Sequence, residues 1–139
     1  MNIASQALQR LQALPQLLQF VLVGGSAAAT HLLVVLVVVA LTGMAPLAAN
    51  VLGFLVAFGV SYNGHAWLTF SAAQARSWAT VARFFAVACL SFVVNELLYA
   101  AALQWLPWNY FWSLALVLLV VAVGTFVLSK FWAFKARSA

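Results

Sequence analysis

The sequence predicts an all-α integral membrane protein with four transmembrane helices, arranged as two parallel two-helix repeats behind a short N-terminal interfacial helix. Of the 139 residues, 68% are hydrophobic and only 5% are charged, whereas a soluble domain carries about 25% charged residues. Four apolar runs each approach the roughly 20 residues that a helix needs to cross a bilayer. These runs do not alternate with period two, which excludes the strands of a membrane barrel and favours helices.

The N-terminal segment, 1–16, is predicted to be a helix that lies on the membrane surface. Ile3, Leu8 and Leu11 fall on one side of a helix over this segment, and its glutamines and Arg10 fall elsewhere. An apolar face opposite a polar one is typical of helices that rest in the headgroup region.

The rest of the chain is predicted to form four spans within a single membrane domain, 1–139. Pro46 and Pro107 lie in or beside the short connections within each pair of spans, where a helix must start or stop. Tryptophans cluster near both ends of the predicted spans, as in two interfacial aromatic belts. The expected spans are about 17–42, 46–70, 81–105 and 110–134.

The basic residues predict the orientation of these spans. With four spans, all of them fall on the side that holds both termini and the 71–80 connection: Arg10, Arg76, Arg83, Lys130, Lys135 and Arg137. Because cytoplasmic loops are enriched in Lys and Arg, we expect both termini in the cytoplasm. The net charge of +5 therefore indicates orientation and contact with anionic membrane lipids, and we expect no nucleic-acid partner.

The two halves of the chain align at a constant offset of 64 residues. The ending SYNGHAWLTF at 61–70 returns as TFVLSKFWAF at 125–134, and the same shift carries His31 onto Asn95. Small residues precede each of these polar residues at helical spacing, which allows close helix contact and an interhelical hydrogen bond. Two interpretations remain open. His31 and Asn95 hold the bundle together, or they line a polar path between the halves.

Glu96, the one acidic residue of the chain, is expected near the middle of the third span. A carboxylate at that depth costs about 2.5–3.5 kcal/mol on insertion scales. Arg83 is 13 residues away, about 20 Å along a helix, so it cannot neutralise Glu96, whereas His31 could. An acidic residue inside a bilayer points by default to a functional role. The predicted polar path therefore comprises His31, Asn95, Glu96 and Asn50.

Short motifs in a fixed order resemble the GtrA-like family of four-helix membrane proteins. The resemblance covers residues 19–134. Its marks are an aromatic-Val-Gly opening (Phe20, Val23, Gly24), an Asn-Gly-Phe start to the second span (Asn50, Gly53, Phe54), a Ser-Tyr…Trp…Thr-Phe close and a Lys-Phe-Trp-x-Phe close.

The resemblance implies a flippase that moves a sugar linked to a polyprenyl phosphate, such as undecaprenyl phosphate, from the cytoplasmic to the outer leaflet. It places the protein in a bacterial inner membrane, in the synthesis or modification of surface polysaccharides. The repeated endings would then form a cytoplasmic rim. Phosphate or headgroup contacts are expected from Arg83, Lys130, His65 and Asn63, and sugar stacking from Trp67 and Trp132.

The sequence departs from the family pattern at two positions. A basic residue commonly precedes the first aromatic, but Gln19 stands there, while the second half keeps Arg83. A basic residue is also usual before the aromatic close of the second span, but Ala66 stands there, while the second half keeps Lys130. The phosphate site is therefore expected to depend mainly on the second half.

No catalytic constellation and no metal-ligand spacing appear in the sequence, so we expect neither enzymatic activity nor a cofactor. Two alternatives to the flippase remain. One is a small multidrug-type exporter coupled to protons through Glu96, and the other is a non-transporting membrane partner of a glycosyltransferase. The expected partners are the sugar lipid, membrane lipids, glycosyltransferases of the same pathway and, because four helices enclose little space, a second copy in a homodimer.

Overall fold

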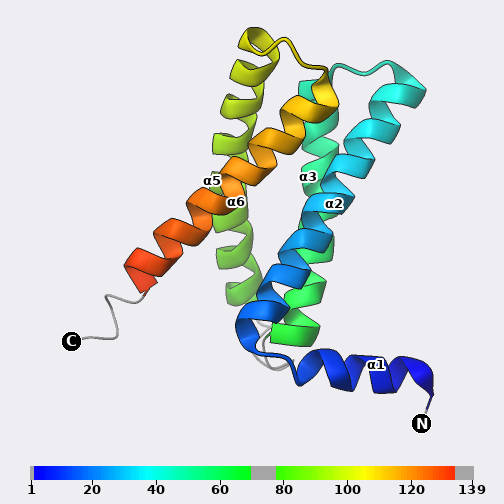
Figure 1. The fold of residues 1–139 in the computed structure, drawn as a ribbon, viewed down its shortest axis with the longest axis vertical. Helices are drawn as coiled ribbons and strands as arrows, with labels where there is room; N and C mark the ends of the chain where they lie inside the picture. Colours follow the sequence, from blue (N-terminus) through cyan, green and yellow to red (C-terminus); the bar gives the residue numbers. More distant parts are fainter. Residues whose placement is uncertain (1, 70–77, 134–139) are drawn as a thin grey trace. The chain divides into compact units, whose positions relative to one another are not determined.

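The protein is helical throughout the described part of the chain, residues 2–69 and 78–133, in the computed structural model (Figure 1). Side chains of residues 16, 17, 69, 80, 81, 83, 84 and 125–133 lie outside the description. The elements are α1 (Ile3–Gln12), α2 (Gln16–Thr42), α3 (Pro46–Gly64), the π-helical turn η1 (His65–Thr69), α5 (Trp78–Trp105) and α6 (Tyr110–Ala133).

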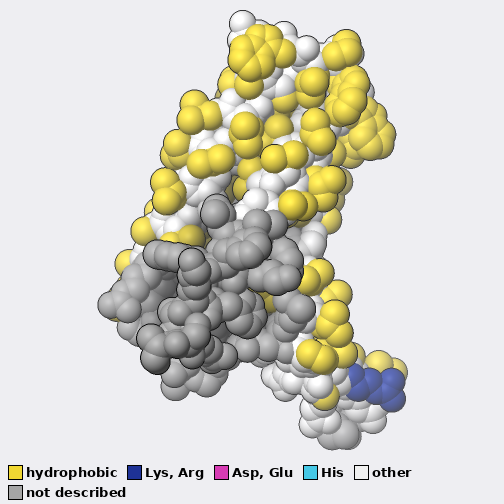
Figure 2. Space-filling view, turned by 60° about the vertical axis from the view of Figure 1, so that its left-hand side comes forward, with side chains coloured by type: hydrophobic (Ala, Val, Ile, Leu, Met, Phe, Trp, Pro, Cys, Tyr) yellow, Lys and Arg dark blue, Asp and Glu magenta, His cyan; other side chains and the backbone are white. Residues whose placement is uncertain are grey.

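Three segments are long and apolar enough to cross a membrane, namely Leu18–Thr42, Pro46–Leu68 and Phe85–Trp105. A fourth, shorter apolar stretch, Tyr110–Gly124, belongs to α6. Hydrophobic side chains cover much of the surface in Figure 2, whereas a basic side chain stands out at the N-terminal end. The prediction of an all-α integral membrane protein is confirmed.

The chain divides into two compact units, residues 1–89 and 90–139, with the boundary inside α5. In the first unit, α2 and α3 form an antiparallel hairpin (Figure 1). Gly43 ends α2 at φ 67°, a left-handed conformation that glycine adopts without strain, and its N–H bonds the carbonyl of Val39. Pro46 then opens α3 at a position where the missing N–H costs nothing.

Small residues allow α2 and α3 to approach closely. Ala27, Ala49, Gly53 and Ala57 are buried along the hairpin. At Gly64 an added Cβ would lie 2.8 Å from a methyl carbon of Val23, so the two helices touch there too. In lipid, where hydrophobicity does not drive helices together, such close backbone packing supplies much of the association energy.

Helix α1 runs across the end of the α2–α3 hairpin (Figure 1). The Asn2 side chain caps its first turn by accepting from the Ser5 N–H. Gln19 is buried, and its Nε2 group donates to the carbonyls of Gln12 and Leu14 at 3.0 and 2.9 Å. The buried amide thus ties the C-terminal end of α1 to the start of α2. The exposed apolar residues of α1 suit a membrane surface, although the interfacial position stays a prediction.

In the second unit, the end of α5 is joined to α6 through a four-residue connection that begins after Trp105. The buried Tyr99 donates its hydroxyl to the carbonyl of Tyr110 at 3.0 Å, which fastens α5 to the first residue of α6. Among the side chains described for α6, up to residue 124, the buried apolar ones are Leu114 and Val117.

Candidate functional site

A polar pair lies at the centre of the α2–α3 contact. His31 on α2 and Asn50 on α3 are 5% and 0% exposed. The Nε2 atom of His31 and the Oδ1 atom of Asn50 are 2.6 Å apart, and the imidazole N–H donates to the amide oxygen. The structure therefore brings together two of the four residues predicted for the polar path, in a bond between neighbouring helices.

Gly53 provides the space for this pair. It follows Asn50 by one helical turn, and an added Cβ would lie 2.6 Å from the Cδ2 atom of His31 and 2.9 Å from a methyl carbon of Val35. Such distances are too short for a real side chain, so the imidazole occupies the volume that a larger residue at 53 would fill. At this level, the buried side chains of His31, Val35 and Asn50 fill the contact between α2 and α3.

We expect a double-mutant cycle to detect strong coupling between His31 and Asn50. Either His31→Leu or Asn50→Leu leaves a buried polar group without this bond, at a cost of about 1–3 kcal/mol. The double substitution removes both groups and should cost clearly less than the sum. Equilibrium unfolding in detergent micelles measures all four stabilities, and additivity within about 0.3 kcal/mol would show that the two side chains do not interact.

The end of the hairpin that contacts α1 buries a second imidazole. His65 opens the π-helical turn η1 and is 5% exposed, and its ring packs against Phe20 of α2 in a tilted arrangement with ring centroids 5.1 Å apart. The Gln12 side chain of α1 donates to the Trp67 carbonyl within the same turn, at 3.2 Å. Short π-helical turns are frequent at functional sites, and this one joins α1, α2 and α3.

The predicted cytoplasmic rim includes both buried and exposed side chains. The amide of Asn63 is exposed and donates to the carbonyl of Gly59 at 2.7 Å, and the indole of Trp67 is 69% exposed. His65, by contrast, faces the interior of the first unit. The helical backbone of Arg83, Lys130 and Trp132 is described, but their side chains are not, so their contacts with phosphate or sugar stay predictions.

The second unit carries the other two polar-path residues on α5. Asn95 is buried, and Glu96 beside it is partly exposed. Ser113 of α6 is also fully buried. Among the described residues, no group of three His, Cys, Asp or Glu side chains could hold a metal ion.

Buried residues of the two units correspond at the offset of 64. Pairs of equivalent positions are buried on α2 and α5 and on α3 and α6. They are His31 and Asn95, Val35 and Tyr99, Ala49 and Ser113, Asn50 and Leu114, and Gly53 and Val117. At these five positions the two helix pairs bury equivalent residues, which supports the predicted duplication.

A protein-family model described as GtrA/DPMS, transmembrane domain, matches residues 19–134. The chain belongs to this family. The match confirms the predicted GtrA-like resemblance and spans α2, α3, α5 and α6. No curated protein and no solved structure matches the chain. Membership of the GtrA/DPMS family makes the chain a multi-pass membrane protein of a family that handles lipid-linked sugars.

Sequence reasoning missed two residues that the structure makes prominent. From the sequence, Gln19 stands only for the loss of a basic residue, whereas in the structure its buried amide links α1 to α2. Gly53 is one of the marks of the family resemblance, but the sequence alone does not predict that it makes room for His31. The spacing of Asn50 and Gly53, a polar and a small residue on one helical face, was the available signal.

Proposed function

We propose that this GtrA/DPMS protein is a flippase that moves a polyprenyl-phosphate-linked monosaccharide from the cytoplasmic to the outer leaflet. The family match across all four long helices carries this proposal, because the family handles lipid-linked sugars. The apolar helical surface supports it, since the hydrocarbon chain of such a lipid can remain in the bilayer while its polar head crosses.

The closed α2–α3 hairpin limits the route that the head can take. His31 and Asn50 hydrogen-bond to each other at its centre, and Gly53 leaves no room for even a methyl group. The sugar therefore crosses along the outer faces of helices and not between α2 and α3. Glu96 is a partly exposed polar group on α5.

The proposed setting is a bacterial inner membrane, with both termini in the cytoplasm and a homodimer as the working form. Supply of the sugar lipid by a glycosyltransferase on one side, and its consumption on the other, would drive net movement. Phosphate contacts are assigned to Arg83 and Lys130, the two basic residues that the second half keeps at the expected cytoplasmic end.

Reconstitution in liposomes tests this function. Purified protein is incorporated with a polyprenyl-phosphate-linked sugar, and the fraction that becomes accessible to a membrane-impermeant sugar oxidant is followed in time. Protein-containing vesicles should expose the inner-leaflet pool far faster than protein-free vesicles. Equal rates in the two preparations would refute the proposed activity.

We expect Arg83→Ala and Lys130→Ala each to weaken binding of polyprenyl phosphate by about tenfold or more, since a charge-assisted hydrogen bond contributes about 1.5–3 kcal/mol. Binding is measured by calorimetry in nanodiscs. Arg10→Ala is the matched control, because it removes the same charge from an exposed position on α1 and should change affinity little. Wild-type affinity in the Arg83→Ala, Lys130→Ala double variant would remove this end from consideration.

A further inference from the structure

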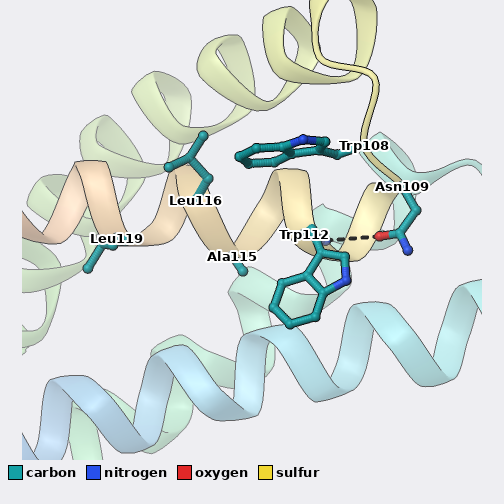
Figure 3. A pocket seen from close by; sticks show the side chains of 6 residues that line it. All are labelled: Trp108, Asn109, Trp112, Ala115, Leu116 and Leu119. Carbon is teal, nitrogen blue, oxygen red and sulfur yellow. Dashed lines mark hydrogen bonds between the residues drawn. The ribbon is translucent and has the colours of Figure 1, made fainter.

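A shallow groove of about 440 Å³ opens beside the connection between α5 and α6. Its volume falls in the range of about 300–1,000 Å³ that small-molecule sites occupy. The groove lies entirely within the second unit. The residues that line it are Trp108, Asn109, Trp112, Ala115, Leu116 and Leu119 (Figure 3).

Two tryptophans form the end of the groove nearest the connection. Trp108 and Trp112 are 51% and 60% exposed, so much of each indole is uncovered by the protein. In Figure 3 the Trp108 ring reaches back along α6 toward Leu116, while the Trp112 ring projects on the side of Ala115. Each indole offers a broad apolar face and one N–H donor.

Asn109 adds a positioned polar group at the same end of the groove (Figure 3). Its Oδ1 atom accepts from the backbone N–H of Trp112 at 3.1 Å and so caps the first turn of α6. The cap fixes which way the carboxamide faces. Its Nδ2 group points away from the helix (Figure 3) and can donate to a ligand hydroxyl.

The remaining lining is hydrocarbon. Ala115, Leu116 and Leu119 continue the groove along α6, away from the connection. No charged residue lines it, and residues 104–111 contain none. The groove thus changes from aromatic and amide groups to aliphatic ones along its length. This order matches an amphipathic ligand with an uncharged hydroxylated ring at one end and a hydrocarbon chain at the other.

We propose that this groove is a second subsite for the lipid-linked sugar, in which the sugar ring contacts Trp108, Asn109 and Trp112 and the first isoprene units lie on Ala115, Leu116 and Leu119. The assignment rests on the proposed function. Because the lining carries no cation, the phosphate gains no ion pair here, and the ligand is held more weakly than at a basic site. Weak binding of the sugar end suits the side on which the lipid is released.

The test compares binding of farnesyl phosphates that carry glucose, galactose, mannose or arabinose with binding of farnesyl phosphate alone. Full-length protein in nanodiscs is titrated by calorimetry, and the ratio of the two affinities reports the contribution of the sugar. For at least one sugar, we expect Trp108→Ala and Trp112→Ala each to reduce this ratio about fivefold, which corresponds to about 1 kcal/mol. Trp108→Phe and Trp112→Phe should retain most of it.

Trp105→Ala is the matched control. Trp105 ends α5 and is 77% exposed, but it does not line the groove. Its replacement should leave the ratio unchanged. An equal reduction in the Trp105→Ala variant would mean that the tryptophans act only as membrane anchors, and the proposal would fail. It would also fail if no sugar improved binding over farnesyl phosphate in the wild type.

Photo-labelling provides a second, independent measurement. A diazirine on the first isoprene unit of the bound probe should label the 112–119 segment, and labelling confined to other segments would overturn the assignment. These results are separable from the proposed function. Sugar-dependent binding at the groove without transbilayer movement would refute the flippase and support the subsite. Transbilayer movement that both Trp→Ala changes leave unaffected, with no labelling at 112–119, would support the flippase and refute the subsite.

Discussion

The Gly53→Ala variant is expected to lose about 1–3 kcal/mol of unfolding free energy, the cost of overpacking a close contact. The new Cβ would lie 2.6 Å from the imidazole of His31 and 2.9 Å from Val35. The imidazole cannot swing aside freely, because its Nε2 atom is hydrogen-bonded to Asn50. Relief of the clash therefore requires either separation of α2 and α3 or loss of that buried hydrogen bond, and each lowers the stability of the fold.

Gly59→Ala is the matched control for this prediction. Gly59 lies in the same helix, and an added Cβ there would meet no atom within 4 Å. The chemical change is identical, so any difference between the two variants reports the contact with His31. Thermal unfolding in detergent, followed by intrinsic fluorescence, should separate them clearly. Equal stability of the two variants would falsify the close contact at Gly53.

The ends of the first hairpin could be predicted from the sequence because local chemistry determines them. Gly43 and Pro46 suit the end of one helix and the start of the next, wherever the rest of the chain lies. The π-helical turn η1 could not be predicted in this way. The apolar pattern continues through His65–Thr69, and the turn makes contacts with residues distant in sequence, such as Gln12.

The pairing of polar residues also lay beyond the sequence pattern. The offset of 64 indicated that His31 and Asn95 are equivalent, which suggested a shared polar path. It did not reveal that His31 is hydrogen-bonded to Asn50, because that contact depends on the register in which α2 packs against α3. Gly53 and its neighbours determine this register. A periodic pattern of small residues predicts that two helices make contact, but it does not give the register of that contact.

The duplicated halves differ most in charge, and this difference bears on where the substrate binds. At equivalent positions the first half has Gln19 and Ala66 where the second has Arg83 and Lys130. Glu96 likewise replaces Leu32. In the first half, Gln19 serves the fold by joining α1 to α2. We therefore expect the substrate contacts to concentrate in the second half.

Glu96→Gln is expected to retain much of the transport activity, whereas Glu96→Leu should lose most of it. A flippase driven by the sugar-lipid gradient needs a polar side chain within the hydrocarbon region that can hydrogen-bond the sugar hydroxyls as they cross. Glutamine has nearly the same shape as glutamate and still donates and accepts hydrogen bonds. Leucine removes this hydrogen-bonding group beside Asn95. A hydroxyl without a partner in an apolar medium costs about 1–3 kcal/mol, which slows crossing roughly five- to hundredfold.

The same pair of variants separates the flippase from a proton-coupled exporter. An exporter of that kind requires a carboxyl group that gains and releases a proton in each cycle, so Glu96→Gln would abolish its transport. Sugar-lipid movement in proteoliposomes is therefore measured with and without an imposed pH gradient. An inactive Glu96→Gln variant, together with a strong response of the wild type to the gradient, would establish proton coupling. Wild-type rates in Glu96→Leu would instead assign Glu96 a structural role, because a polar side chain at this position would then not be needed for the sugar to cross.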